Sequence, residues 1–148
     1  MFENDSDVTT STTQKNYATP ITRTSQSLSP ELPLTIGSGE QYRMIRDFKE
    51  LAVQNFKMIL LTSPGEKVMD SNFGVGLRSY LFELDSESVK STIARRIENQ
   101  AQEYAPYISV TSITYPPIGD SNTLNIRIKF LINSINVEEE LMFSSLGI

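Results

Sequence analysis

Apolar residues recur at helical spacing in two stretches of the chain. The first stretch runs from Gly39 to Leu60, and its apolar side chains fall every three or four residues at Tyr42, Ile45, Phe48, Ala52, Phe56 and Ile59. The second runs from Ser86 to Tyr104 and has the same spacing at Val89, Ile93, Ile97 and Ala101. Such stripes predict two amphipathic helices, each with one buried face. Charged residues on the other faces of the second helix, Arg95 and Arg96 among them, indicate a solvated surface.

The last third of the chain has the period of a β-sheet. Apolar and polar side chains alternate strictly over residues 124–132, which predicts a half-buried strand. Residues 108–115 are rich in β-branched side chains and predict a strand before it, and residues 137–143 predict a shorter strand after it. We therefore predict an α+β fold in which two main helices precede a three-stranded antiparallel sheet.

A turn-rich segment joins the two helices. Pro64 presets φ and Gly65 can take a positive φ, so residues 62–66 predict a tight turn. The flanking residues 58–62 and 66–69 have the length to pair as a short hairpin.

The glycine-spaced residues Phe73, Gly74 and Gly76 follow this turn. We interpret them as close backbone packing around Phe73, because the G-x-G spacing lacks the third glycine and the long preceding strand of a dinucleotide site. A short helix after them is expected to place Leu77, Leu81 and Phe82 in the core.

Residues 1–38 differ from the rest of the chain. They are dense in Ser and Thr, contain three prolines and show no apolar period. Such a stretch cannot bury enough surface to offset its own ordering entropy. Two interpretations stay open, a disordered tail and an extended arm that other chains of a large assembly hold in place. We favour the extended N-terminal arm, with the folded domain at residues 39–148.

Composition removes several classes of function. The chain has neither cysteine nor histidine, so it lacks a disulfide framework, a thiol nucleophile and the usual general base and metal ligand. The net charge of −5 disfavours nucleic acid and anionic membranes as partners. The longest aliphatic run, Met58 to Leu61, is far too short to span a bilayer, and the acidic N-terminus is unlike a secretory signal. We expect no cofactor, no metal site and synthesis in a cytoplasm.

One enzymatic alternative remains, a peptidoglycan hydrolase with a pair of carboxylates. That chemistry needs two carboxyl groups across a cleft, one of them with a raised pKa. The candidates Glu83, Asp85 and Glu87 fall at a loop and a helix start, where acidic residues usually cap the helix. We therefore expect no catalytic residues.

Residues 60–77, followed by Leu81-Phe82-Glu83, resemble a known family. In the sheath-initiator wedge subunits of contractile phage baseplates, and in a related subunit of the type VI secretion baseplate, this segment reads approximately L-T-x-x-G-E-R-x-x-x-P-x-F-G-x-x-L…L-F-E. The resemblance covers about residues 40–145 and is most specific from Pro64 to Phe82. It implies a non-enzymatic structural subunit of the virion, located in the tail baseplate.

The resemblance also implies a docking site on the wedge core at the end of the second helix. Many family members carry Glu-Pro-Arg there, whereas this chain has Ala105-Pro106-Tyr107. The contact would then depend on packing by Tyr104, Pro106 and Tyr107.

By the same resemblance, the last strand would face the tail sheath and template its first ring by strand addition. The residues of this sheath-facing strand are Val137, Glu138, Glu139, Glu140 and Leu141. Its three glutamates have two interpretations, a charged docking edge and a merely solubilising one. The implied partners are baseplate wedge proteins and sheath subunits, with the tube or hub as a partner of the arm. A generic adaptor or tail-completion protein of another contractile assembly is the main alternative.

Overall fold

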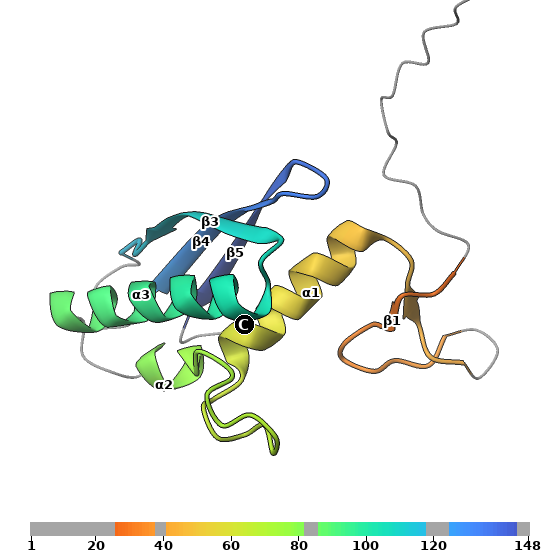
Figure 1. Cartoon of the computed structure of the whole chain (residues 1–148), viewed down its shortest axis with the longest axis horizontal. Helices are drawn as coiled ribbons and strands as arrows, with labels where there is room; N and C mark the ends of the chain where they lie inside the picture. The colour runs from red at the N-terminus through yellow and green to blue at the C-terminus, as the bar shows by residue number, and fades with distance from the viewer. Residues whose placement is uncertain (1–25, 38–40, 82–85, 118–124, 145–148) are drawn as a thin grey trace, which may run out of the picture.

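Two helices cover one face of a three-stranded sheet in the computed structural model (Figure 1). The structure describes residues 26–37, 41–81, 86–117 and 125–144. Its main elements are α1 (Phe48–Leu61), α2 (Leu77–Leu81), α3 (Glu87–Tyr104), β3 (Ile108–Thr114), β4 (Asn125–Ile132) and β5 (Val137–Ser144). The sheet is an antiparallel meander in the order β3-β4-β5, so the predicted α+β fold is confirmed.

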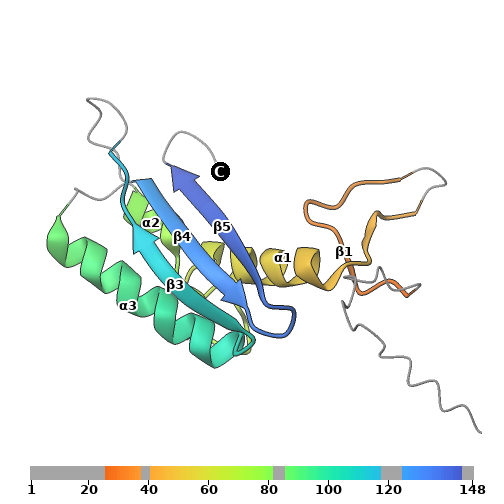
Figure 2. The same cartoon turned by 90° about the horizontal axis from the view of Figure 1, so that it is seen from above.

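The alternation along β4 separates a core face from an open face. Its inward side chains are completely buried and consist of Ile126, Ile128, Phe130 and Ile132. Phe130 lies opposite Glu139 on β5 and Val110 on β3, and its ring meets Phe56 of α1 edge to face at 4.8 Å. The other face lies away from α1 and α3, as the view from above shows (Figure 2).

Helix α1 begins later than the apolar spacing predicts. Asp47 is its N-cap, and the carboxylate of Asp47 accepts a hydrogen bond from the Lys49 N–H at 3.0 Å. The preceding residues form β2 (Met44–Ile45), which pairs antiparallel with β1 (Ser29–Pro30). The prediction of helix before Phe48 is therefore wrong, because residues 42–45 make their backbone hydrogen bonds to an earlier segment instead of to the next turn.

A short ribbon thus precedes α1. The Leu28 N–H donates to the Ile45 carbonyl and the Glu31 N–H to the Arg43 carbonyl, both at 2.9 Å. Gln54 fixes the ribbon to α1: its amide accepts from the Leu32 N–H at 2.8 Å and donates to the Pro30 carbonyl at 3.0 Å. The last part of the predicted arm therefore pairs with its own chain. Residues 1–25 lie outside the described residues, and their ordering by partners stays a prediction.

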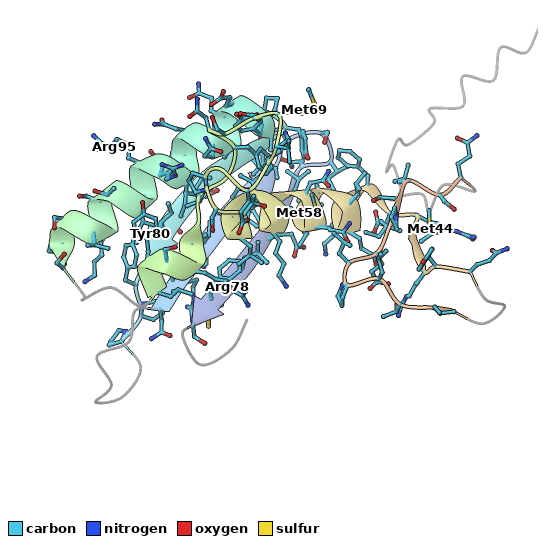
Figure 3. The ribbon with its side chains drawn as sticks, turned by 90° about the horizontal axis from the view of Figure 1, so that it is seen from below. Met44, Met58, Met69, Arg78, Tyr80 and Arg95 are labelled. Atoms are coloured by element: carbon cyan, nitrogen blue, oxygen red, sulfur yellow. The ribbon has the colours of Figure 1, made fainter. Side chains whose placement is uncertain are left out.

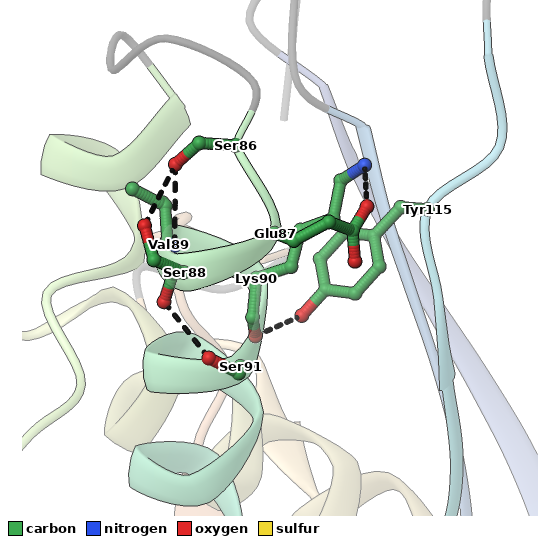
Figure 4. A network of polar contacts seen from close by, with 7 residues as sticks. All are labelled: Ser86, Glu87, Ser88, Val89, Lys90, Ser91 and Tyr115. Carbon is green, nitrogen blue, oxygen red and sulfur yellow. Dashed lines mark hydrogen bonds and ion pairs between the residues drawn. The ribbon is translucent and has the colours of Figure 1, made fainter.

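Helix α3 has the predicted bounds. Ser86 is its N-cap, and the Ser86 hydroxyl accepts a hydrogen bond from the Val89 N–H at 3.3 Å. The same end of the helix is held to the sheet, because the Tyr115 hydroxyl donates to the Lys90 carbonyl at 2.8 Å (Figure 4).

The segment between α1 and α3 contains the short helix α2. As predicted, Leu77 and Leu81 are buried in the core, whereas Phe82 lies outside the described residues. The hairpin suggested for residues 58–62 and 66–69 is wrong. Residues up to Leu61 belong to α1 and form their backbone hydrogen bonds within the helix.

Candidate functional site

The linker between α1 and α2 contains the turn expected at residues 62–66. The Glu66 N–H donates to the Ser63 carbonyl at 3.1 Å, and Gly65 has a φ of +89°. The Glu66 carboxylate accepts from the Ser63 N–H at 2.8 Å, and the Gly65 N–H donates to the Ser71 carbonyl at 2.9 Å. Pro64 and Gly65 thus occupy the central positions of a type II turn.

Gly74 lies where this linker passes between the two long helices. Its φ is +98°, and a Cβ at this position would come within 2.2 Å of the Thr62 carbonyl oxygen. The Gly74 N–H donates to the side chain of Gln100 at 2.6 Å. The Gly74 carbonyl accepts from Nε and Nη2 of Arg96 at 3.2 and 3.0 Å. Only glycine fits this conformation and this space.

The next two residues bind the other helix. The Val75 N–H donates to the Ile59 carbonyl at 2.9 Å, and the Gly76 N–H donates to the Thr62 carbonyl at 2.8 Å. Both acceptors belong to the C-terminal end of α1, whose last carbonyls have no partner within the helix. The linker therefore joins α1 to α3 through hydrogen bonds on both sides.

Two polar side chains of α3, those of Arg96 and Gln100, bind the linker and were not predicted as site residues. Arg96, predicted to lie on a solvated surface, binds the linker, and Gln100 is buried with 7% of its surface exposed. The signal that identifies them is their spacing of four residues along the edge of the apolar stripe. A glycine-rich linker without regular structure needs such partners for its backbone groups.

Tyr104, at the end of α3, packs against the same linker. Its ring meets Phe73 edge to face at 4.9 Å, and the ammonium of Lys67 lies 4.3 Å from the centre of the Phe73 ring. A hydrogen bond to the Asp70 carboxylate, with some desolvation, raises the pKa of Tyr104 to about 12. Between Lys67 and Asp70 the turn carries two almost fully exposed apolar side chains, Val68 and Met69.

Tyr107 is held elsewhere. Its ring lies 5.9 Å from that of Phe48, and its hydroxyl accepts from Asn55 at 3.4 Å, so it packs on α1. Pro106, between the two tyrosines, is exposed. The structure thus places Tyr104 against the linker, Tyr107 against α1 and Pro106 at the surface between them.

The three glutamates of β5 have different surroundings. Glu139 points to the helix side and forms an ion pair of 2.5 Å with Lys49 on α1. Glu140 lies on the open face near Arg127 and Lys129, at 3.4 and 3.7 Å. Glu138 is exposed and has no ion pair within the described part of the chain.

Val137 and Leu141 are half-buried on the helix side of β5, opposite Ile132 and Ile128 of β4. The alternation along this strand therefore sets apolar residues and Glu139 against the helices, and Glu138 and Glu140 on the open face.

Of the three carboxylates considered for hydrolysis, Glu87 is the one that falls within the described residues. Glu87 has 91% of its side chain exposed and pairs with Lys90 at 3.1 Å (Figure 4). Glu83 and Asp85 lie outside the described residues. Within the described ranges, no group of three acidic side chains is placed to hold a metal ion, and no helix is long and apolar enough to cross a membrane.

Solved structures contain the same arrangement of helices and sheet. A protein of Geobacter sulfurreducens described as a candidate tail lysozyme superposes with a TM-score of 0.58, at 23% identity over 69% of this chain and 93% of that one. A chain of the anti-feeding prophage baseplate superposes with a TM-score of 0.63, at 18% identity over 73% of this chain and 86% of that one. These likenesses establish the class by its fold, a small α+β domain that is also present in the anti-feeding prophage baseplate.

Sequence comparison identifies the family. Baseplate wedge protein gp25 of Enterobacteria phage T4 is 31% identical over 74 residues, which make up 50% of this chain and 56% of that protein. The match thus spans little more than half the length of this relative. The family model for baseplate wedge protein gp25 matches residues 47–137, from the N-cap of α1 to the start of β5. The chain belongs to this family of structural baseplate proteins, as the resemblance of residues 60–83 predicts.

Proposed function

We propose that the chain is a non-enzymatic baseplate subunit that docks on the wedge core and templates the first ring of the tail sheath by strand addition. It works without cofactor, nucleic acid or membrane, and it is assembled in the host cytoplasm into the virion baseplate. Wedge proteins and sheath subunits are its partners, and the part of the N-terminal arm that precedes the ribbon, residues 1–25, reaches toward the tube or hub.

The open edge of β5 carries the sheath-templating part of this proposal. Among the described strands, this eight-residue strand pairs with β4 alone, so its other edge has no described partner. An unpaired edge supplies backbone donors and acceptors to an incoming strand, and the alternate side chains set its register. Because Lys49, Arg127 and Lys129 already pair with Glu139 and Glu140, Glu138 is the glutamate that can attract a cationic partner.

The docking part is supported by the elbow, which is the bend at residues 105–108 between α3 and β3, because hydrogen bonds hold its backbone. The Ala105 N–H donates to the Ala101 carbonyl at 2.9 Å, and the Ile108 N–H donates to the Ala105 carbonyl at 2.8 Å. The Asn133 N–H binds the Tyr107 carbonyl at 2.9 Å and fixes the elbow to the β4–β5 turn. The exposed ring of Pro106 is therefore held at a defined position, where a partner can pack on it without ordering the backbone.

Electron microscopy of tail particles tests this function. Particles that lack the subunit should have baseplates or tubes without extended sheath, and normal contractile sheaths would overturn the proposal. Particles with Glu138→Lys should show fewer sheathed tails, because the added cation repels the partner strand. Glu138→Gln is the matched control and should have a smaller effect.

A further inference from the structure

An apolar groove crosses the outer side of α1, away from α3 and the sheet. Met58 and Leu61 of α1 form its floor, and Leu32 and Pro33 of the ribbon form one wall. The turn at Ser63 and the start of α2, with Arg78, form the other wall. Met58 and Arg78 lie on the same face of the molecule (Figure 3). Met58 and Leu32 keep 41% and 46% of their surface exposed, so the groove leaves large apolar side chains uncovered.

Hydrogen bonds hold both walls of this groove. Gln54 bonds the ribbon to α1 through the backbone of Pro30 and Leu32. The opposite wall is closed by the hydrogen bonds of the Ser63–Glu66 turn. Helices that carry apolar residues on both their inner and outer sides are usually covered by other elements on both sides. A partner segment would therefore find a site whose backbone is already ordered.

The charges around the groove identify the kind of partner. Lys57 and Arg78 both line it, are exposed, and have no ion pair within the described part of the chain. The one carboxylate in the lining, that of Glu66, already accepts the Ser63 N–H. The lining thus carries two cations and one carboxylate beside an apolar floor, a local excess of positive charge, although the whole chain has a net charge of −5.

We infer that this groove binds an acidic segment of another baseplate protein, whose apolar side chains pack on Met58 and Leu61 while its carboxylates pair with Lys57 and Arg78. The apolar floor favours a polypeptide over nucleic acid, which would need a basic surface that follows its phosphates. Opposite charges at the rim would steer and orient the segment, and the apolar contacts would hold it. This inference rests on the proposed baseplate role, but it concerns the side of α1 away from the sheet and is independent of strand addition at β5.

Photo-crosslinking in assembled tails tests the inference. The full chain with Met58→benzoylphenylalanine is incorporated into particles, which are irradiated, digested and analysed by mass spectrometry. We expect one crosslinked peptide from a different protein, with more acidic than basic residues. The same photo-reactive group at Arg95, an exposed position on α3, is the positional control and should not label this peptide.

Charge variants decide the mechanism. In the crosslinking chain, Lys57→Glu with Arg78→Glu should lower the yield by about fivefold or more, the effect of losing two exposed ion pairs. The matched variant Lys57→Arg with Arg78→Lys should keep the yield. Circular dichroism of the purified chains checks that both variants fold. If the reversed chain folds but no longer enters particles while the matched chain does, the inference is also supported.

Other outcomes overturn it. These are a crosslink to residues 1–25 or to a second copy of the chain, to nucleic acid or lipid, or to a basic peptide. The inference is also overturned if no crosslink forms at all, or if the two charge variants give equal crosslinking yields. The presence of sheath in the same particles is scored separately by microscopy, so a failure of strand addition is distinguished from a failure of the groove.

Discussion

The carbonyl oxygen of Gly74 accepts two hydrogen bonds from the guanidinium of Arg96, at 3.2 and 3.0 Å. The N–H of the same glycine is bound by Gln100, one helical turn further along α3. Two side chains of one helix thus satisfy both backbone polar groups of one linker residue. Because the linker also bonds to the end of α1, this contact links the two long helices through backbone geometry in addition to apolar packing.

Loss of the Arg96 side chain should therefore destabilise the domain. Arg96→Ala leaves the Gly74 carbonyl without its partner, and we expect a loss of about 1–3 kcal/mol in the free energy of unfolding. The adjacent Arg95 is exposed on the same helix and is the matched control (Figure 3). Arg95→Ala should stay within about 0.5 kcal/mol of the unmodified chain. Urea unfolding followed by circular dichroism measures the stability of both variants. Equal losses would mean that the contact of Arg96 with Gly74 does not stabilise the fold.

Two of the linker glycines, Gly65 and Gly74, separate the cost of backbone strain from the cost of steric exclusion. Both have positive φ, but a Cβ at Gly65 would meet nothing within 4 Å, whereas one at Gly74 would clash with the Thr62 carbonyl. We expect Gly65→Ala to cost about 1 kcal/mol, from the left-handed conformation alone. Gly74→Ala should cost about 3 kcal/mol, because the linker must also move. Denaturant midpoints of the two variants test this order, and an equal cost would show that the linker relaxes freely around Gly74.

The spacing of apolar residues predicted the elements that bury one continuous apolar face. The bounds of α3 and β4 follow from the sequence because each carries an unbroken apolar stripe on one face, and a serine caps the helix. The start of α1, in contrast, could not be predicted from the apolar spacing. Tyr42 and Ile45 extend the helical spacing by coincidence, since a buried Ile45 on a short strand and one on a helix look alike in sequence.

The polar contacts were the part that pattern reasoning missed. Arg96 and Arg95 are identical neighbours in sequence, and only the fold shows which of them meets a backbone carbonyl. The acidic run on β5 has the same difficulty. Its three members lie on alternate faces of the strand, so a single interpretation for Glu138, Glu139 and Glu140 could not fit all of them.

This difference within the acidic run can be measured. Glu139→Gln removes the ion pair with Lys49, and we expect a loss of about 0.5 kcal/mol at neutral pH, since the pair is partly exposed. The hydrogen bond from Lys49 to Glu139 raises the pKa of Lys49 above its ordinary 10.5. The contribution of the pair is therefore complete below pH 10.5 and is lost as pH rises through the raised pKa.

Urea unfolding at neutral and at strongly alkaline pH checks this prediction. The stability difference between the unmodified chain and Glu139→Gln should shrink at high pH. Glu138→Gln is the control, and it should match the unmodified chain at both values because its side chain is exposed without an ion pair within the described residues. A difference for Glu139→Gln that does not change with pH would contradict the assignment to Lys49.

The hydrogen bond between Tyr104 and Asp70 gives the end of α3 a spectroscopic signature. It favours the neutral phenol and raises the pKa of Tyr104 from 10.0 to about 12. A raised pKa in the folded state stabilises the fold below pH 10.0, and this contribution is lost as pH rises toward about 12. Among the six tyrosines, ultraviolet absorbance of tyrosinate should therefore show a late ionisation step that Tyr104→Phe abolishes. Tyr42→Phe should leave this step in place, because Tyr42 is exposed on the ribbon far from the linker. If Asp70→Asn left the late ionisation step unchanged, the hydrogen bond to Asp70 would not be the cause of the raised pKa of Tyr104.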